Sequence, residues 1–337
     1  MKPQTGPGTL PPDSHVHSQW SWDAPAGSME ITCRRAAEIG LPAVAFTEHA
    51  DFTPWSLEPG EKIPGEWSQL ASDGVLTPPA LDLDGYRECL YRCRERFPGL
   101  RILSGVELSE PHRHHGQSEA LLRDGSFDRI LASVHSARAG TGFTEVSSSF
   151  RDQSPAQVLR AYLAETAALI TQFDAFEILA HIDYPVRRWP QDARPHDPRE
   201  LQDEYRHVLR TLASTGKILE VSTRVPLHPL LLTWWRQEGG QAITFASDAH
   251  DPATLAAGFT EAAHMAEATG FTPTHDPCDP LVPEPDPGSA QRSPAGSPTN
   301  NSARPSKKTK NVLLLLRSAD LARRPRPALI TLRDWFS

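Results

Sequence analysis

Three histidines near the N-terminus have the spacing of a metal site. His15 and His17 are separated by one residue in a short extended segment, so their side chains point to the same side of a strand. His49 follows the next apolar run, residues 43–46, and can bring a third imidazole to the same place. A pair of this kind also arises by chance among 14 histidines, so its meaning depends on the residues that accompany it.

Further side chains that can bind metal follow the later apolar runs. The full set of candidate donors is His15, His17, Asp23, His49, Glu107, His135, His181, Asp183, Asp248 and His250. Nitrogen and oxygen donors without thiolates suit zinc, manganese or iron. One ion takes about four to six ligands, so we expect two or three divalent ions, with a carboxylate such as Glu107 bridging a pair. Adjacent ions lower the pKa of a shared water and hold a transferring phosphoryl group.

The elements that must position these side chains alternate between strands and helices. Seven short apolar segments predict strands at residues 13–17, 43–47, 101–106, 129–134, 176–180, 217–222 and 242–247. Helix-start signals lie between them, such as Ser154-Pro155 and Asp197-Pro198. Apolar strands of this kind are buried on both faces, which predicts a parallel sheet wrapped by helices. Seven such units favour a closed or nearly closed barrel, and the candidate donors stand at the carboxyl ends of its strands.

Composition divides the chain into three parts. Residues 1–12 are an expected flexible N-terminus, and residues 13–270 are the expected barrel domain. Residues 271–337 are an expected proline-rich linker and C-terminal tail. Between residues 272 and 306 there are too few apolar side chains to offset chain entropy, so we expect a disordered segment.

Charge and cysteine content restrict the partners and the location. A formal net charge of −8 argues against long nucleic acid or an anionic membrane as the partner. Arginines and metal ions can still attract a small phosphorylated substrate. The four sparse cysteines predict reduced thiols. Residues 1–12 lack an apolar signal core and no apolar run approaches a membrane span, so we expect a cytoplasmic protein with no membrane contact. The sequence predicts no particular oligomeric state.

Six short motifs, in order along the chain, resemble the polymerase and histidinol phosphatase (PHP) family. They are His15-x-His17, Glu48-His49, Gly105-Val106-Glu107, Ser133-Val134-His135, His181-Ile182-Asp183 and Ser247-Asp248-Ala249-His250. The resemblance covers about residues 13–270. It implies a distorted seven-stranded β/α barrel of the TIM type with a trinuclear metal centre, in agreement with the strand count.

The resemblance also implies how the ligands divide among the ions. One ion is expected at His15, His17, Glu107 and Asp248, a second at Glu107, His135 and His181, and a third at Asp23, His49 and His250. Asp23 stands where histidinol phosphatases of the family often carry histidine. Glu48 is expected to orient an imidazole and not to bind an ion.

Within the family, His181–Tyr184 and Leu219–Thr223 most resemble the histidinol-phosphatase branch. This implies a metal-dependent phosphoric monoester hydrolase that converts L-histidinol phosphate and water to L-histidinol and phosphate in histidine biosynthesis. The implied mechanism is attack on phosphorus by a metal-bridging hydroxide. The candidate catalytic residues are Asp183, Arg187, Arg188 and Arg224. The arginines can bind phosphate, and Asp183 can position or protonate the leaving alkoxide or hold His181 in place.

Substrate specificity is expected to lie in three loops, residues 18–28, 51–80 and 110–126, and two of these loops carry residues with two interpretations. The indoles of the loop Gln19-Trp20-Ser21-Trp22 can stack on a flat substrate ring or pack as a lid. The segment Glu110-Pro111-His112-Arg113-His114-His115 matches no motif, and its histidines indicate either substrate contacts or a solvated loop.

Two other functions stay open at this point. The first is a phosphodiesterase or nuclease, or a nucleotide phosphatase, although the acidic charge and the lack of a basic, aromatic groove weigh against long nucleic acid. The second is a non-catalytic, metal-bound scaffold whose tail recruits a partner. The ligand types do not distinguish zinc, manganese and iron.

Overall fold

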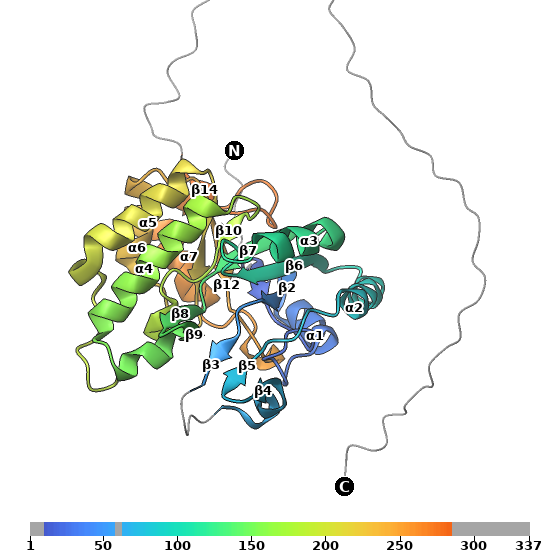
Figure 1. Cartoon of the computed structure of the whole chain (residues 1–337). Coiled ribbons are helices and arrows are strands. Elements are labelled where there is room, and N and C mark those ends of the chain that lie inside the picture. Colours follow the sequence, from blue (N-terminus) through green and yellow to red (C-terminus); the bar gives the residue numbers. More distant parts are fainter. Residues whose placement is uncertain (1–9, 58–62, 285–337) are drawn as a thin grey trace, which may run out of the picture. The chain divides into compact units, whose positions relative to one another are not determined.

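Seven parallel strands form a closed barrel in the computed structural model, which describes residues 10–57 and 63–284 (Figure 1). In chain order these strands are β1 (Asp13–Val16), β2 (Ala43–Asp51), β6 (Arg101–Ser109), β7 (Arg129–Ser133), β10 (Ile178–Leu179), β11 (Ile218–Ser222) and β12 (Ile243–Ala246). Each strand pairs with the next barrel strand along the chain, and β12 closes the ring by pairing with β1. The predicted seven-stranded β/α barrel is therefore confirmed.

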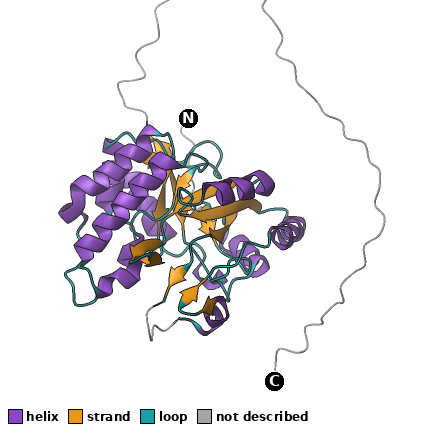
Figure 2. Ribbon diagram, viewed as in Figure 1, coloured by secondary structure: helices purple, strands orange, loops and turns teal. Residues whose placement is uncertain are grey.

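Helices cover the outside of the barrel in the described part of the chain (Figure 2). They are α1 (Met29–Ile39), α2 (Leu83–Arg96), α3 (His115–Gly125), α4 (Pro155–Gln172), α5 (Gln202–Ser214), α6 (Pro229–Gln237) and α7 (Phe259–Ala268). The side chain of Ser28 accepts a hydrogen bond from the first turn of α1, and Gly40 ends that helix with a left-handed φ of 74°. The side chains of Ser154 and Gln157 form a capping box at the start of α4.

Two helices begin later than the sequence predicts. A short 3₁₀ turn, η4 (Pro198–Leu201), precedes α5. A second turn, η5 (Pro252–Thr254), precedes α7, which starts only after Gly258 with its φ of 76°. The Asp-Pro pairs were expected to open the α-helices, but each of them caps a 3₁₀ turn instead.

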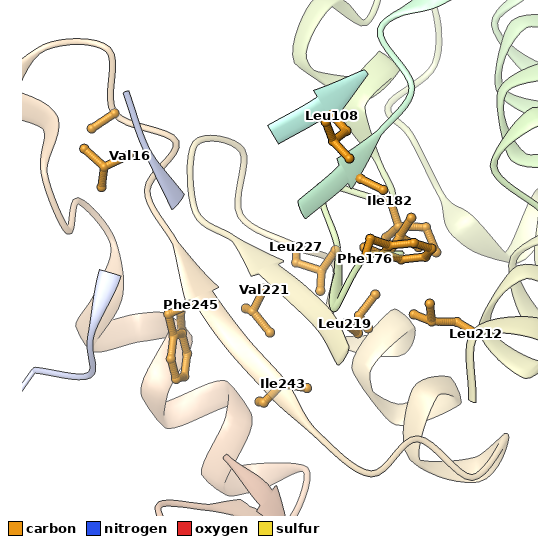
Figure 3. Packing of buried hydrophobic residues seen from close by; sticks show 14 of the residues in the cluster. Val16, Leu108, Phe176, Ile182, Leu212, Leu219, Val221, Leu227, Ile243 and Phe245 are labelled. Carbon is orange, nitrogen blue, oxygen red and sulfur yellow. The ribbon is translucent and has the colours of Figure 1, made fainter. Parts of the chain in front are cut away.

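Side chains alternate between the interior of the barrel and the helices. Leu131, Ile178 and Ile218 pack in a small separate cluster, and the strand register places them side by side. Leu219 belongs instead to the large cluster that includes the helices, and Figure 3 shows it among residues of that cluster. Because successive side chains point to opposite faces, Glu220 faces the interior with Ile218. The barrel interior is therefore apolar at one level and carries a carboxylate nearer its carboxyl end.

The expected loop at residues 51–80 contains a small antiparallel sheet. Its strands are β3 (Trp55–Ser56), β4 (Ala71–Ser72) and β5 (Val75–Leu76), in the order β3-β5-β4, with a 3₁₀ helix η1 (Gly65–Leu70) between them. Buried Trp55 and Leu76 anchor the sheet. Strands of two residues are too short to show a periodic pattern, so the sequence did not predict them.

Residues after β6 and β7 also form elements that the sequence did not predict. Helix α3 occupies much of the expected loop 110–126, and it starts at His115 without a side-chain hydrogen bond at its N-cap. The absence of a capping signal explains why the sequence did not predict it. Strands β8 (Ser136–Ala139) and β9 (Gly142–Glu145) form a hairpin, followed by the 3₁₀ helix η2 (Val146–Arg151).

The ordered unit extends beyond residue 270, where the linker was expected to begin. Strands β13 (Phe271–Thr272) and β14 (Val282–Pro283) pair with each other, and the main chain of Leu281 exchanges two hydrogen bonds of 2.9 Å with Ile243. Phe271 and Leu281 are buried, so these few apolar residues hold the segment against the barrel. The remainder of the expected tail, from residue 285, and residues 1–9 lie outside the described residues. Among the residues described, no helix is long and apolar enough to span a membrane.

Candidate metal centre

The nine predicted metal ligands meet at the carboxyl end of the barrel. His15, His49 and Glu107 lie in strands β1, β2 and β6, and the others follow strands or stand in the loop after β1. Register pairs His49 with Glu107 on adjacent strands, which places two of these side chains next to each other. Seven of the nine are buried, whereas Asp23 and His250 are partly exposed.

The carboxylate of Glu107 lies at the centre of the cluster and divides it. Its Oε2 atom is 3.1 Å from His15 Nε2 and 3.4 Å from His17 Nε2. Its Oε1 atom is 2.8 Å from His181 Nε2 and 3.2 Å from His135 Nε2. Its Oε2 atom also lies 3.2 Å from His49 Nδ1. One carboxylate therefore faces two imidazoles with one oxygen and three with the other, which is the arrangement of a bridging ligand.

Two aspartates complete the grouping. Asp248 Oδ1 lies 3.2 Å from His17 Nε2 and 3.7 Å from His15 Nε2, on the side of the first pair. Asp23 Oδ2 lies 3.1 Å from His250 Nε2 and 3.3 Å from the Nε2 atom of His49, the sixth imidazole. The structure thus brings all nine side chains together. Their donor atoms also form groups that cross the expected division, because His17 lies with His49 and His250, and His15 lies with Glu107 and His181.

The spacing of the donor atoms fits metal ions. His15 Nε2 and His17 Nε2 are 3.0 Å apart, and His135 Nε2 and His181 Nε2 are 3.3 Å apart. Two nitrogens bound to one zinc ion at about 2.0–2.1 Å with tetrahedral angles lie about 3.3 Å apart. Asp23 Oδ1 is buried and has no hydrogen-bond partner among the described residues, so an acceptor oxygen is left over in the third group. Both observations fit a set of ligands arranged around cations.

The electrostatics at Glu107, Asp248 and His17 favour the deprotonated form that metal binding requires. Burial opposes the charge of Glu107, but the imidazoles, His15 foremost, hold its pKa well below the usual range. Burial also opposes ionisation of Asp248, and the Arg187 guanidinium foremost keeps its pKa well below normal. Burial, aided by the charges of His49 and of its other imidazole neighbours, lowers the pKa of His17 well below normal, which leaves a neutral ring with a free lone pair.

Other imidazoles of the cluster show the opposite shift. Burial lowers the pKa of His49, but nearby carboxylates, Asp23 first, outweigh it and raise the value to about 9. The pKa of His135 is raised well above normal against burial, chiefly by the charge of Glu107. The carboxylates therefore create a negative potential that attracts cations to this end of the barrel.

Outer hydrogen bonds fix which ring nitrogen faces the centre. His17 Nδ1 lies 2.9 Å from Ser21 Oγ, and that hydroxyl donates to Glu48 Oε2 over 2.6 Å. His135 Nδ1 lies 2.8 Å from Ser109 Oγ. In both cases Nε2 remains directed at the carboxylates. The predicted supporting role of Glu48 is consistent with this hydrogen bond, which reaches His17 through Ser21.

Glu220 and Asp51 are functional candidates that the sequence analysis missed. Glu220 Oε2 lies 2.8 Å from His15 Nδ1, and its Oε1 accepts a 3.0 Å hydrogen bond from the main-chain nitrogen of His181. Asp51 accepts hydrogen bonds from Ser109 Oγ and, over 2.7 Å, from Trp22 Nε1. A charged residue inside the apolar strand 217–222 was the available signal for Glu220. Asp51 stands two residues after His49 and had no comparable signal.

The candidate catalytic residues differ in their distance from the cluster. Arg187 is 13% exposed and forms an ion pair with Asp248, and its Nη2 atom is buried without a hydrogen-bond partner in the described part of the chain. Arg224 is half-exposed, and its Nη1 donates over 3.1 Å to the main-chain oxygen of Asp248. Arg188 is exposed and has no hydrogen bond or ion pair with any described residue, so the structure does not bring it to the cluster.

Asp183 is 5% exposed and lies just after His181. Burial raises its pKa to about 6, and the neighbouring Arg187 charge opposes that shift. His181 Nδ1 is buried and finds no hydrogen-bond partner among residues 10–57 and 63–284. The structure therefore shows no bond by which Asp183 orients that ring.

The two indoles of the loop after β1 serve in packing. Trp22 lies 5.0 Å from the ring of Trp67 and 5.7 Å from that of Trp55, measured between ring centroids. Trp20 packs so closely on Gly85 that an added Cβ atom there would lie 2.3 Å from the indole. These contacts support the lid interpretation of the loop.

Comparisons with known proteins agree with this geometry. A histidinol-phosphatase of Lactococcus lactis is 26% identical over 254 residues, which cover 71% of this chain and 83% of that protein. A probable histidinol-phosphatase of Clostridium acetobutylicum is 23% identical over 273 residues, covering 77% of this chain and 94% of the relative.

A solved structure shares the fold. The crystal structure of the Lactococcus lactis histidinol phosphate phosphatase, in complex with zinc, L-histidinol and phosphate, superposes with a TM-score of 0.67 at 23% identity. The superposition covers 81% of this chain and 99% of that one. The PHP domain as a family matches residues 13–224, well over half of the 337 residues. On this match, and with the barrel and the six motifs in place, the chain belongs to the PHP domain family.

Proposed function

We propose that this protein is a metal-dependent phosphatase that hydrolyses L-histidinol phosphate to L-histidinol and phosphate. The observation that carries the proposal is the buried Glu107 carboxylate, whose two oxygens face five imidazoles within 3.4 Å. Buried ionisable groups that gather at one barrel end are typical of catalytic sites. The names of the relatives from Lactococcus and Clostridium support this choice of substrate.

The proposed centre holds two to three divalent ions, of zinc, manganese or iron. The first would be held by His15, His17, Glu107 and Asp248, the second by Glu107, His135 and His181, and the third by Asp23, His49 and His250. When bound, such ions lower the pKa of water and offset the charge of phosphoryl oxygens. The zinc in the structure of the Lactococcus relative supports zinc as one choice.

Arginine side chains are proposed to bind the phosphate of the substrate. Arg187 is oriented by Asp248 and keeps the buried Nη2 atom free to donate, which suits a phosphate oxygen. Arg224 reaches the same edge of the cluster and is exposed enough to meet an incoming substrate. Arg188 is not proposed to bind phosphate, because its side chain is exposed and forms no hydrogen bond or ion pair with the described residues of the cluster.

Asp183 is proposed to supply the proton that the leaving group needs. In hydrolysis, a water oxygen forms a bond to phosphorus while the bond from phosphorus to the histidinol oxygen breaks. That oxygen leaves as an alcohol only if it gains a proton, and a buried carboxyl group beside Arg187 is suited to position or deliver it. Oxygen from labelled water should then enter phosphate in a single step, and phosphate trapped on the enzyme would contradict this scheme.

A substrate panel tests the proposal against its alternatives. Metal-reconstituted protein is assayed with L-histidinol phosphate, nucleoside monophosphates and a phosphodiester at equal concentrations. We expect kcat/KM for L-histidinol phosphate to exceed the other values by about 100-fold or more, because the site must recognise both the phosphate and the amino alcohol. A preference for the diester or for nucleotides would instead support the nuclease or nucleotide phosphatase alternative.

We also propose a cytoplasmic location for this reaction. All four cysteines are buried free thiols, as expected in a reducing compartment. Fractionation of the native cells would test this location directly.

A further inference from the structure

The segment from Glu110 to His115, which matches no motif in the sequence, lies largely inside the protein. Glu110 is 1% exposed, and Pro111 and His112 are also buried. The solvated loop expected here is therefore wrong for the first half of the segment. None of its histidines belongs to a metal-binding group among the described residues. Its buried position needs another explanation.

Glu110 binds the main chain of a proposed metal ligand. Its Oε1 atom accepts hydrogen bonds from the main-chain nitrogens of His135, over 2.5 Å, and Ser136, over 2.8 Å. Its Oε2 atom accepts a 3.1 Å hydrogen bond from Thr53 Oγ1. The residue has a positive φ of 45°, a conformation that costs energy for a side chain other than glycine. Strain of this kind persists only where surrounding contacts hold it.

Arg113 binds the other side of the same dipeptide. Its Nη1 atom donates over 2.9 Å to Ser136 Oγ, and its Nη2 atom lies 3.4 Å from the main-chain oxygen of Ser136. Glu165 on α4 holds the guanidinium in turn, with its Oε1 atom 2.8 Å from Nε and 2.7 Å from Nη2. His112 Nε2 lies 2.7 Å from the same oxygen. An acidic and a basic side chain thus hold the backbone at His135 and Ser136.

The fold explains why this ligand needs such support. His49 and Glu107 lie inside nine-residue strands, so the barrel hydrogen bonds fix their backbone. Strand β7 ends at Ser133, and the chain then turns into the β8–β9 hairpin, so His135 lies beyond the ladder of the barrel. Its main-chain oxygen accepts a 2.9 Å hydrogen bond from the main-chain nitrogen of Val146, and its main-chain nitrogen is left for a side chain to hold.

We propose that Glu110 and Arg113 are positioning residues that clamp His135 and Ser136 and so set the place of the imidazole in the metal centre. The clamp acts on the ion assigned to Glu107, His135 and His181, and in this respect it rests on the proposed function. Ser109 fixes the ring from its Nδ1 side, and the clamp fixes the backbone. Together they leave His135 Nε2 directed at Glu107 Oε1.

The test compares four variants of the metal-loaded full chain. Glu110→Ala removes the acceptor, whereas Glu110→Gln keeps one amide oxygen for the two main-chain nitrogens. Arg113→Met removes the guanidinium but retains the aliphatic stem. Glu119→Ala, at an exposed acidic residue of α3, is the matched control. The measurements are bound metal per chain by elemental analysis, the rate of metal loss to a chelator, and kcat and KM for L-histidinol phosphate.

We expect Glu110→Ala to lose metal faster and to lower kcat, each by about 10- to 100-fold, with KM changed by less than about threefold. Glu110→Gln should recover most of both values, Arg113→Met should show a smaller loss of both, and Glu119→Ala should match the parent. A variant Glu110→Ala that melts at a lower temperature but keeps the parent's metal-loss rate and kcat would overturn the clamp.

Two further results keep the test decisive. If Glu110→Ala fails to fold, the metal-loss rate of Arg113→Met tests the clamp instead. A rate equal to that of the parent protein would overturn the clamp. If the parent protein releases no phosphate from L-histidinol phosphate, the proposed function fails while the metal-loss rates still support or overturn the clamp.

Discussion

One carboxylate, Glu107, determines how the cluster is organised at the scale of single residues. Its Oε1 atom faces two imidazole nitrogens and its Oε2 atom faces three, and register with His49 on β2 fixes its backbone. Arg187 and Asp248 form a second buried charged contact beside it. Substitutions of these residues therefore report on the metal ions and on the phosphate separately.

Glu107→Gln should remove the charge that two proposed ions share. An amide is a poor bridging ligand, so we expect the loss of at least one bound ion per chain and a fall in kcat of about 100-fold or more. Elemental analysis and a phosphate-release assay measure the two effects. Glu177→Gln, at an exposed position, is the control. Full metal content together with unchanged turnover in Glu107→Gln would contradict the bridging role.

Arg187→Lys should weaken phosphate binding while the metal content stays at the parent level. A lysine keeps the charge but loses the forked donors of a guanidinium, so we expect kcat/KM to fall by about 10- to 100-fold. Arg188→Lys is the matched control on the next residue, because that side chain is exposed. Equal effects of both substitutions would argue against a specific role for Arg187.

At the scale of elements, the repeated strands of the barrel could be predicted from the sequence, whereas helix α3 and the small sheet β3-β5-β4 could not. The seven apolar runs and the pair Ser154-Pro155 were sufficient to predict the barrel and the start of α4. Helix α3 lacks a capping side chain, and the sheet β3-β5-β4 has strands of two residues, so neither left a pattern. The donors at strand ends were predictable because a parallel barrel brings those ends together.

Contacts formed only by tertiary structure could not be predicted in the same way. Glu220 reaches His15 across the barrel interior, and Glu110 reaches His135 from a neighbouring strand end. Neither spacing nor residue type indicates these pairs, because they depend on the register of strands that are far apart in sequence. Arg188 was predicted as a catalytic candidate because, like Arg187, it follows a strand end in the sequence. Its side chain is exposed, whereas that of Arg187 contacts Asp248.

The link between α4 and the segment after β6 should depend on pH. The pKa of Glu165 is lowered from 4.5 to about 2, first by its hydrogen bond with His112 and then by the charge of Arg113. Because the folded value lies below the unfolded one, its stabilisation is present above about pH 4.5 and is lost as pH falls towards about 2.

Glu165→Gln tests this link through the free energy of unfolding of the metal-free protein. We expect the parent to exceed the variant by about 1 kcal/mol at pH 7, a modest value because the Glu165 side chain is 31% exposed. The difference should shrink as pH falls below about 4.5. If the difference in the free energy of unfolding stays constant between pH 7 and pH 3, the charge of Glu165 does not contribute to stability.

At the scale of the whole molecule, the proposed metal ligands come from six of the seven barrel strands. They come from the ends of β1, β2, β6, β7, β10 and β12, so ions bound there would connect strands distant in sequence. Binding that occurs only in the folded state adds to the stability of the fold. The barrel and its ions are therefore expected to be coupled.

Removal of metal should lower the melting temperature of the protein. We expect a decrease of about 5 °C or more after treatment with a chelator, and recovery when zinc or manganese is restored. Differential scanning calorimetry measures the shift, and the variant Asp248→Asn should show a smaller one. Identical melting temperatures with and without metal would mean that the cluster contributes nothing to folding through bound ions.

The most direct test of the central claim is phosphate release from L-histidinol phosphate by metal-reconstituted protein, with bound ions counted on the same sample. We expect rapid turnover with two to three ions bound per chain, and loss of that turnover in His17→Ala. Bound ions without phosphate release would support the metal centre but contradict L-histidinol phosphate as the substrate. If the protein neither binds ions nor releases phosphate, both the metal centre and the phosphatase activity are contradicted.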